Sequence, residues 1–271
     1  EAERKFLDVL KTKEFGYHLY ARVALAALNL LKGRMAETRA QFDQGLGLAE
    51  KASDGWWQAV YHTMLAALDM ESGKHEEAMR ECDSAWTAAQ KSTDDLRWQR
   101  RILFLKGLAY LEAKSPDAAR KAADELKRMC EEGMNRKDIR YYHHLMGRIE
   151  LEKKNYPEAI ENFQKANSLL PFQHEIGPFT NDHALFGEAL AQAYYADGDK
   201  EKARREYEKI ASLTSGRLYR GNIYARSFYM RGRIDEEQGL KDRAKEMYAK
   251  YLDLLKDADP AIAQVADARK R

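Results

Sequence analysis

The stretch that decides the fold is HHLMGRIELEKKNYPEAIENFQKANSLLP, residues 143–171. It holds two small residues, Gly147 and Ala159, twelve positions apart, with Asn155 and Pro157 between them. Small residues let two crossing helices approach closely, because a side chain larger than a methyl group would push their axes apart. Asn tolerates the left-handed conformation that ends a helix, and Pro is harmless where the next helix starts. The stretch therefore predicts a helical hairpin.

The same arrangement recurs about six times along the chain. The first small residues of the copies are Ala26, Ala66, Gly107, Gly147, Ala191 and Gly232. The second small residues are Thr38, Ala78, Ala118, Ala159, Ala203 and Ala244. Turn signals precede most of the second set, at Gly33, Gly73, Asn155, Gly198 and Gly239. The first set repeats at intervals of 40, 41, 40, 44 and 41 residues, and a nearly constant period predicts a repeat array.

Aromatic residues and composition agree with a helical array. Phe42, Phe163, Tyr207 and Tyr248 follow the second small residue by four positions, which places them on the core face of the second helix. Five prolines and 16 glycines among 271 residues are too few for the many turns of a β-sandwich. The abundant Ala, Leu, Glu, Lys and Arg are good helix formers. The fold class is predicted to be all-α.

The repeats divide the chain into three parts. Residues 18–256 form the repeat array, in which 172–179 make an irregular connection. Residues 1–17 predict one helix with an apolar face, left from an upstream repeat. Residues 257–271 predict a final polar helix, from Ala261 to Arg271, that caps the exposed end of the array.

Residues 143–171 resemble a tetratricopeptide repeat almost place for place, and residues 232–248 look similar. The resemblance covers roughly 18–256 and is weakest in the first repeat, where Thr38 and Gly45 replace the expected alanines. The period of 40–44 exceeds the family's usual period of about 34 and resembles longer variants in bacterial regulatory and peptide-sensing proteins. The resemblance implies a right-handed superhelical solenoid of about six helix–turn–helix repeats, whose first helices line a concave groove.

Charge and cysteine content restrict the function classes. The 46 basic and 44 acidic residues leave a net charge of +2, which argues against nucleic acid as the main partner. No apolar run is long enough to span a membrane. The sequence starts with neither a signal peptide nor Met, so we expect a fragment of a longer, cytoplasmic protein. Cys82 and Cys130 form no motif and are expected to be reduced.

The run Tyr141-Tyr142-His143-His144 invites a metal or catalytic interpretation. Neighbouring helical residues point about 100° apart, so the two histidines cannot chelate together. We expect His143 on the packing face and His144 on the groove face. The sequence contains no GxSxG, HExxH, P-loop or GxGxxG motif. We therefore predict no enzyme, no metal and no cofactor.

Binding is the remaining candidate. Residues six and three positions before the first small residue, and one and four after it, should face the groove. In repeats three to six they include the predicted partner-binding set: Arg101, Phe104, Tyr141, His144, Arg148, Glu188, Gln192, Tyr195, Arg226, Tyr229 and Arg233. Arg and Tyr are enriched at interface hot spots, and together they favour an acidic and apolar segment. Glu188 and Glu236 would oppose this by neutralising two of the arginines.

The sequence thus predicts a protein- or peptide-binding scaffold, part of a larger bacterial regulatory or signalling protein. Three alternatives stay open. The groove positions of repeats one and two are small and apolar, so the array could form a homodimer or larger assembly through an uncapped end. Those positions could also simply pack against residues 1–17 or an absent upstream repeat. An enzyme is retained only because His and Tyr cluster near Tyr141.

Overall fold

The computed structural model describes residues 1–91, 95–133, 135–171, 181–214, 217, 219–260 and 262–271. These residues form fourteen α-helices and one short 3₁₀ helix, without a β-strand, which confirms the all-α class. The helices are α1 Ala2–Val9, α2 Phe15–Leu31, α3 Met35–Lys51, α4 Gly55–Glu71, α5 His75–Ala89, α6 Asp95–Glu112, α7 Pro116–Glu132, η1 Arg136–Asp138, α8 Ile139–Glu152, α9 Tyr156–Ser168, α10 His183–Asp197, α11 Lys200–Ala211, α12 Gly221–Glu237, α13 Lys241–Leu254 and α14 Ala263–Ala268. The connection expected over 172–179 lies outside the described residues.

Six hairpins run from α2–α3 to α12–α13, and their turns share one geometry. A residue with φ between +57° and +90° lies seven positions after the first small residue of each hairpin: Gly33, Gly73, Lys114, Lys154, Gly198 and Gly239. The N–H of the following residue bonds to the carbonyl five positions back, as from Arg34 to Asn29 at 3.0 Å and from Leu240 to Asp235 at 2.8 Å. This pairing ends a helix by satisfying carbonyls that the helix itself leaves free.

Two details of the predicted repeat are wrong. The left-handed residue in the fourth repeat is Lys154, not Asn155, and the third repeat uses Lys114. The second small residue of the third repeat is Ala119, which is 0% exposed, whereas Ala118 is only half-buried. With Ala119 the two small residues stand twelve positions apart in all six hairpins, because an identical turn imposes an identical spacing.

The small residues lie where the helices of a hairpin approach each other. A Cβ added to Gly147 would lie 2.6 Å from the Phe163 ring, and one added to Gly232 would lie 2.7 Å from the Tyr248 ring. Both distances are far inside van der Waals contact. The predicted core aromatic therefore packs directly on the first small residue, and a larger side chain would separate α8 from α9 or α12 from α13.

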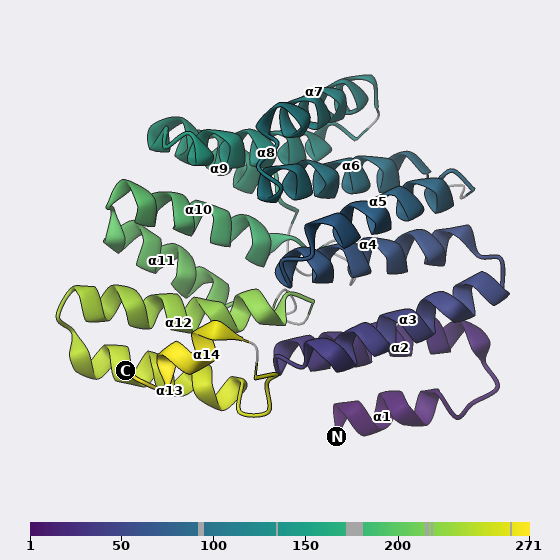
Figure 1. Cartoon of the computed structure of the whole chain (residues 1–271), viewed down its shortest axis with the longest axis horizontal. Helices are drawn as coiled ribbons and strands as arrows, with labels where there is room; N and C mark the ends of the chain where they lie inside the picture. The colour runs from purple at the N-terminus through teal and green to yellow at the C-terminus, as the bar shows by residue number, and fades with distance from the viewer. Residues whose placement is uncertain (92–94, 134, 172–180, 215–216, 218, 261) are drawn as a thin grey trace. The chain divides into compact units, whose positions relative to one another are not determined.

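Contacts divide the chain into two compact units. Unit 1 contains Glu1–Ala26 and Arg39–Leu169, and unit 2 contains Ala27–Thr38 and Leu170–Arg271. Within unit 1, the first helices α4, α6 and α8 contact one another in sequence, and each packs against the second helix of its own hairpin. Within unit 2, α10 and α12 do the same with α11 and α13 (Figure 1). The tip of the first hairpin belongs to unit 2.

The two end helices are shorter than expected. The single helix expected over 1–17 is instead α1, which ends at Val9, followed by a break before α2 begins at Phe15. None of the residues of α1 is buried. The helix expected from Ala261 to Arg271 is α14, Ala263–Ala268, and its Val265 and Ala268 are buried in a cluster with residues of α12 and α13.

Candidate partner-binding face

In unit 1 the structure brings together four of the predicted site residues. The Phe104 ring on α6 has its centroid 4.9 Å from that of Tyr141 on α8 and 5.2 Å from that of His144. Arg101 donates a hydrogen bond from Nη1 to the Tyr141 hydroxyl at 3.3 Å. Phe104, Tyr141 and His144 are buried, with at most 4% of each residue exposed. These rings therefore join two consecutive first helices instead of presenting an open surface.

His144 does not lie on an exposed face, contrary to the prediction. Its ring is 1% exposed and lies between the rings of Phe104 and Phe163, each about 5 Å away. His143 is half-buried, with Nδ1 at 3.3 Å from Asn162 Oδ1, and burial lowers its pKa. The two histidines thus have separate surroundings, as expected, but His144 is part of the core.

His144 is buried because of its position in the repeat, and the same position is buried in every repeat. The position three before the first small residue is buried in all six repeats, where it holds Val23, Thr63, Phe104, His144, Glu188 and Tyr229. In unit 1, Phe104 and His144 show that this position contacts the neighbouring first helix. The positions one after the small residue are half-buried where they carry Arg148, Gln192 and Arg233. These positions, together with Tyr195, remain accessible to a partner.

In unit 2 the predicted residues form ion pairs. Arg226 on α12 donates from Nε and Nη2 to the two carboxylate oxygens of Glu188 on α10, at 2.6 and 2.9 Å. The Glu188 side chain is 7% exposed, so the pair is shielded from water. A two-point contact of this kind is among the strongest polar interactions that side chains make. The predicted neutralisation of an arginine by Glu188 is therefore present.

Glu236 does not neutralise a groove arginine. It accepts a hydrogen bond from the Tyr248 hydroxyl at 2.9 Å and pairs with Arg271 near the C-terminus. Arg233 instead pairs with Glu237, at 3.6 Å on the next helical turn. Glu237 also accepts from the Tyr195 hydroxyl at 2.5 Å.

Arg148, the predicted arginine of the fourth repeat, also has a carboxylate partner. Its Nη2 lies 3.0 Å from Glu112 Oε1, so it joins α8 to α6. Arg148, Arg226 and Arg233, the predicted arginines of repeats four to six, thus each have a carboxylate partner on the same or the preceding first helix. A partner would have to compete with Glu112 or Glu237, which are more exposed than Glu188. The sequence did not reveal the pairing of Arg148 with Glu112 or the hydrogen bond of Tyr195 with Glu237, because these residues stand 36 and 42 positions apart.

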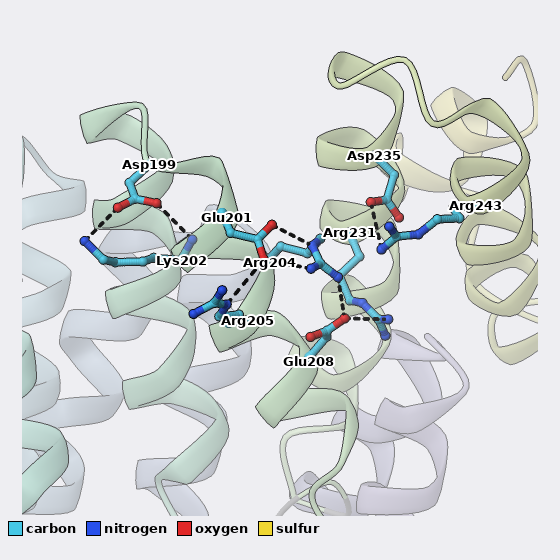
Figure 2. A network of polar contacts seen from close by, with 9 residues as sticks. All are labelled: Asp199, Glu201, Lys202, Arg204, Arg205, Glu208, Arg231, Asp235 and Arg243. Atoms are coloured by element: carbon cyan, nitrogen blue, oxygen red, sulfur yellow. Dashed lines mark hydrogen bonds and ion pairs between the residues drawn. The ribbon is translucent and has the colours of Figure 1, made fainter.

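A second polar network joins α11, α12 and α13 in unit 2, as Figure 2 shows. Arg204 on α11 contacts Glu201 at 2.9 Å and Glu208 at 2.7 Å. Arg231 on α12 reaches Glu208 at 3.4 Å, and Arg243 on α13 reaches Asp235 at 3.4 Å. The contacts within α11 follow the helical spacing of three and four that can be read from sequence, whereas those between helices cannot. The network fixes repeat five against repeat six.

Other chemistry is sparse in the described part of the chain. It contains no group of three or more His, Cys, Asp or Glu placed to hold a metal ion. No described helix is both long and apolar enough to cross a membrane. Cys82 and Cys130 are free and buried, and burial raises their thiol pKa values to about 12 and about 11.

Comparisons with known proteins agree with this architecture. Residues 225–254 match the family model of the tetratricopeptide repeat. No curated protein matches the sequence. Among solved structures, the chain is similar to one from the APC/C hetero-tetramer Cut9–Hcn1, with a TM-score of 0.53 and 15% identity over 93% of this chain and 42% of that chain.

Two further solved structures are similar over most of their own length. BtubC (BKLC) from P. vanneervenii has a TM-score of 0.49 and 16% identity, over 81% of this chain and 90% of that one. YrrB, described as a TPR protein with an unusual peptide-binding site, has a TM-score of 0.42 and 16% identity, over 85% and 98%. The sixth repeat thus matches a tetratricopeptide repeat, and the shared turn geometry and paired small residues show that all six hairpins have a similar form.

Proposed function

We propose that the chain is a protein- or peptide-binding scaffold, working as part of a larger bacterial regulatory or signalling protein. The observation that supports it is the stacking of first helices at one repeated geometry. Repeat arrays of this kind form extended surfaces on which successive helices supply side chains to one ligand. The long period supports the bacterial assignment only through the resemblance already described. YrrB, a similar protein, is described as having a peptide-binding site.

Half-buried residues of the first helices are proposed to touch the partner. These are Arg101 and Arg148 in unit 1, and Gln192, Tyr195, Arg226 and Arg233 in unit 2. The buried members of the predicted set, Phe104, Tyr141, His144, Glu188 and Tyr229, hold the helices in register beneath them.

The ion pairs suggest what kind of partner fits. Arg148 and Arg233 are held by carboxylates that remain partly exposed, on Glu112 and Glu237. A carboxylate of the partner can replace Glu112 or Glu237, because arginine binds any carboxylate with the same planar geometry. Exchange costs little, since the arginine is paired before and after. We therefore propose an acidic segment with apolar residues between its carboxylates.

The test is capture of a partner from lysate by the variant Arg148→Ala/Arg233→Ala. We expect weaker capture with unchanged helicity by circular dichroism. The matched control is Arg120→Ala/Arg128→Ala, which removes two arginines from the exposed face of α7 that are also paired with carboxylates. Capture that is equally strong in the wild type and the first variant contradicts the proposal.

Salt dependence provides a second measurement. Binding of an acidic peptide library should weaken between about 50 and 500 mM salt, over which the screening length falls severalfold. Binding unchanged over that range would show that the arginines are not its cause.

One observation favours a second candidate function, self-association through the N-terminal end. Among the described residues, four large hydrophobic side chains within positions 7–20 are well exposed: Leu7, Phe15, Tyr17 and Tyr20, at 40–64%. Monomeric proteins rarely expose such side chains in a group. Sedimentation of the chain across a hundredfold concentration range tests this. A dimer that dissociates in Leu7→Ser/Tyr17→Ser supports self-association, and a 31.3 kDa monomer throughout rejects it.

A further inference from the structure

The turn of the first hairpin is bound by the segment that follows α13, and both belong to unit 2. The Asp259 carboxylate accepts hydrogen bonds from the N–H groups of Met35 at 2.8 Å and Ala36 at 3.1 Å. The N–H of Asp259 donates to the Gly33 carbonyl at 3.1 Å. The first N–H groups of a helix have no partner within the helix. Asp259 therefore caps α3 from more than 220 positions away in sequence.

Apolar packing and an ion pair surround this cap. A Cβ added to Gly33 would lie 2.7 Å from Ala258 Cβ, 3.0 Å from Leu255 and 3.1 Å from Ile262. Arg34 Nη2 lies 3.0 Å from Asp257. The other glycines at this turn position, in repeats two, five and six, have open space where a Cβ would be. The first turn is thus unlike the other three glycine turns in being covered.

The same segment continues into α14, which covers the sixth repeat. Asp267 accepts a hydrogen bond from the Tyr229 hydroxyl at 2.6 Å, and Arg271 pairs with Glu236. Val265 and Ala268 are buried in the cluster that contains Tyr229. Tyr229 belongs to the predicted partner-binding set, and Glu236 lies two helical turns further along the same face of α12. Residues 265–271 therefore cover Tyr229 and contact Glu236, on the face of α12 that also carries Arg226 and Arg233.

We propose that residues 255–260 and 262–271 are an intramolecular strap, anchored on the turn of the first hairpin and covering Tyr229 on the predicted partner face of α12. Displacement of the strap uncovers Tyr229, which lies beside Arg233, and so enlarges the surface of α12 that is open to a partner. The consequence for partner binding rests on the proposed scaffold function, whereas the strap itself is tested without any partner. The free energy needed to open a local segment of this kind is lower than that needed to unfold the whole chain, because opening breaks only the contacts of the segment itself.

The first experiment compares Gly33→Ala with Gly73→Ala by hydrogen exchange and mass spectrometry on the full chain. Both glycines have φ of +71°, so both variants carry the same backbone strain. Only the methyl group at position 33 meets the strap. We expect faster exchange over residues 255–271 in Gly33→Ala and wild-type exchange there in Gly73→Ala. Equal exchange of the strap in the two variants overturns the proposal.

The second experiment leaves the turn intact and changes the strap. Asp259→Ala removes the cap of α3, and Asp259→Asn keeps an oxygen that can accept the same N–H groups. The amides of residues 35–38 should exchange about fivefold faster in Asp259→Ala, as the loss of a cap implies, and near the wild-type rate in Asp259→Asn.

A labelled peptide of residues 255–271 then reports whether the strap occupies its binding site on the first turn and α12 in the intact chain. It should bind Asp259→Ala more tightly than the wild type, because the tethered wild-type strap is present at a high effective concentration. A peptide carrying the same Asp259→Ala change should bind neither chain. Equal affinity of the wild-type peptide for both chains overturns the strap, and it leaves the scaffold function to its own test.

Discussion

The pair of first helices α6 and α8 can be compared with the pair α10 and α12. The position three before the first small residue holds Phe104 and His144 in the first pair, whose rings pack together at 5.2 Å. In the second pair it holds Glu188 and Tyr229, and Glu188 binds Arg226 through two hydrogen bonds. All four residues are buried. Phe104 and His144 belong to an aromatic contact, Glu188 belongs to an ion pair, and Tyr229 donates a hydrogen bond to Asp267.

The comparison separates what builds the repeat from what joins repeats. The hairpin depends on the turn and on two small residues, which recur at the same spacing in both pairs. The contact between repeats can be made by aromatic rings or by an ion pair, provided that each buried polar group has a partner. The two pairs should therefore respond differently to salt, pH and substitution.

The largest expected effect is in the aromatic pair. Phe104→Ala should lower the free energy of unfolding by about 4 kcal/mol, because it removes a buried ring and leaves a cavity. The loss should not depend on salt. Urea unfolding followed by circular dichroism measures it, with Tyr17→Ala, whose side chain is 64% exposed, as the control. A loss no greater than that of the control would show that the ring does not hold α6 to α8.

The ion pair should give the next largest effect. Glu188→Ala should cost about 3 kcal/mol, because it leaves the Arg226 guanidinium without its carboxylate in a shielded place. Glu188→Ala/Arg226→Met should recover most of the loss, since no uncompensated charge remains. A double-mutant cycle with Arg226→Met measures the coupling. Strictly additive single effects would contradict a coupled pair.

Acid should affect the second pair before the first. The hydrogen bond from Arg271, followed by that from Tyr229, holds the pKa of Asp267 at about 2, below its unfolded value of about 3.9. A lowered pKa stabilises the fold above the unfolded value, and this stability is lost as the pH falls toward 2. The protection of the amides over 263–271, measured relative to their intrinsic exchange rate at each pH, should therefore fall between about pH 4 and 2. In Asp267→Asn this protection should already be low and should not change with pH over that range.

The smallest effect is expected in the polar network of α11, α12 and α13 that Figure 2 shows. Arg205 pairs with Glu201 at 3.3 Å, and both side chains are largely exposed to water. Arg205→Ala should change the free energy of unfolding by no more than about 0.5 kcal/mol, because exposed ion pairs are weak. A thermal melt at low and high salt checks this value. A larger loss would mean that the network acts as a cooperative unit.

The repeat can be predicted from the sequence alone, and the structure confirms it. Gly33, Gly73, Gly198 and Gly239 mark their turns because a positive φ strongly favours glycine. Gly147 and Ala159 mark the crossing of α8 and α9 because only small residues fit there. Each of these signals resides in one residue and its local geometry, so no knowledge of distant residues is needed.

Other details depend on contacts between residues that are distant in the sequence, and only the tertiary structure shows them. Lys114 and Lys154 take the left-handed conformation because their helices pack like the others, although lysine has no preference for it. His144 is buried because the ring of Phe104, forty positions earlier, lies against it. The sequence placed arginines on the first helices and indicated that Glu188 neutralises one of them, but it could not show that Glu112 on α6 pairs with Arg148 on α8. It gave no sign that Asp259 caps α3, because such a contact depends on how the whole chain brings distant backbone groups together.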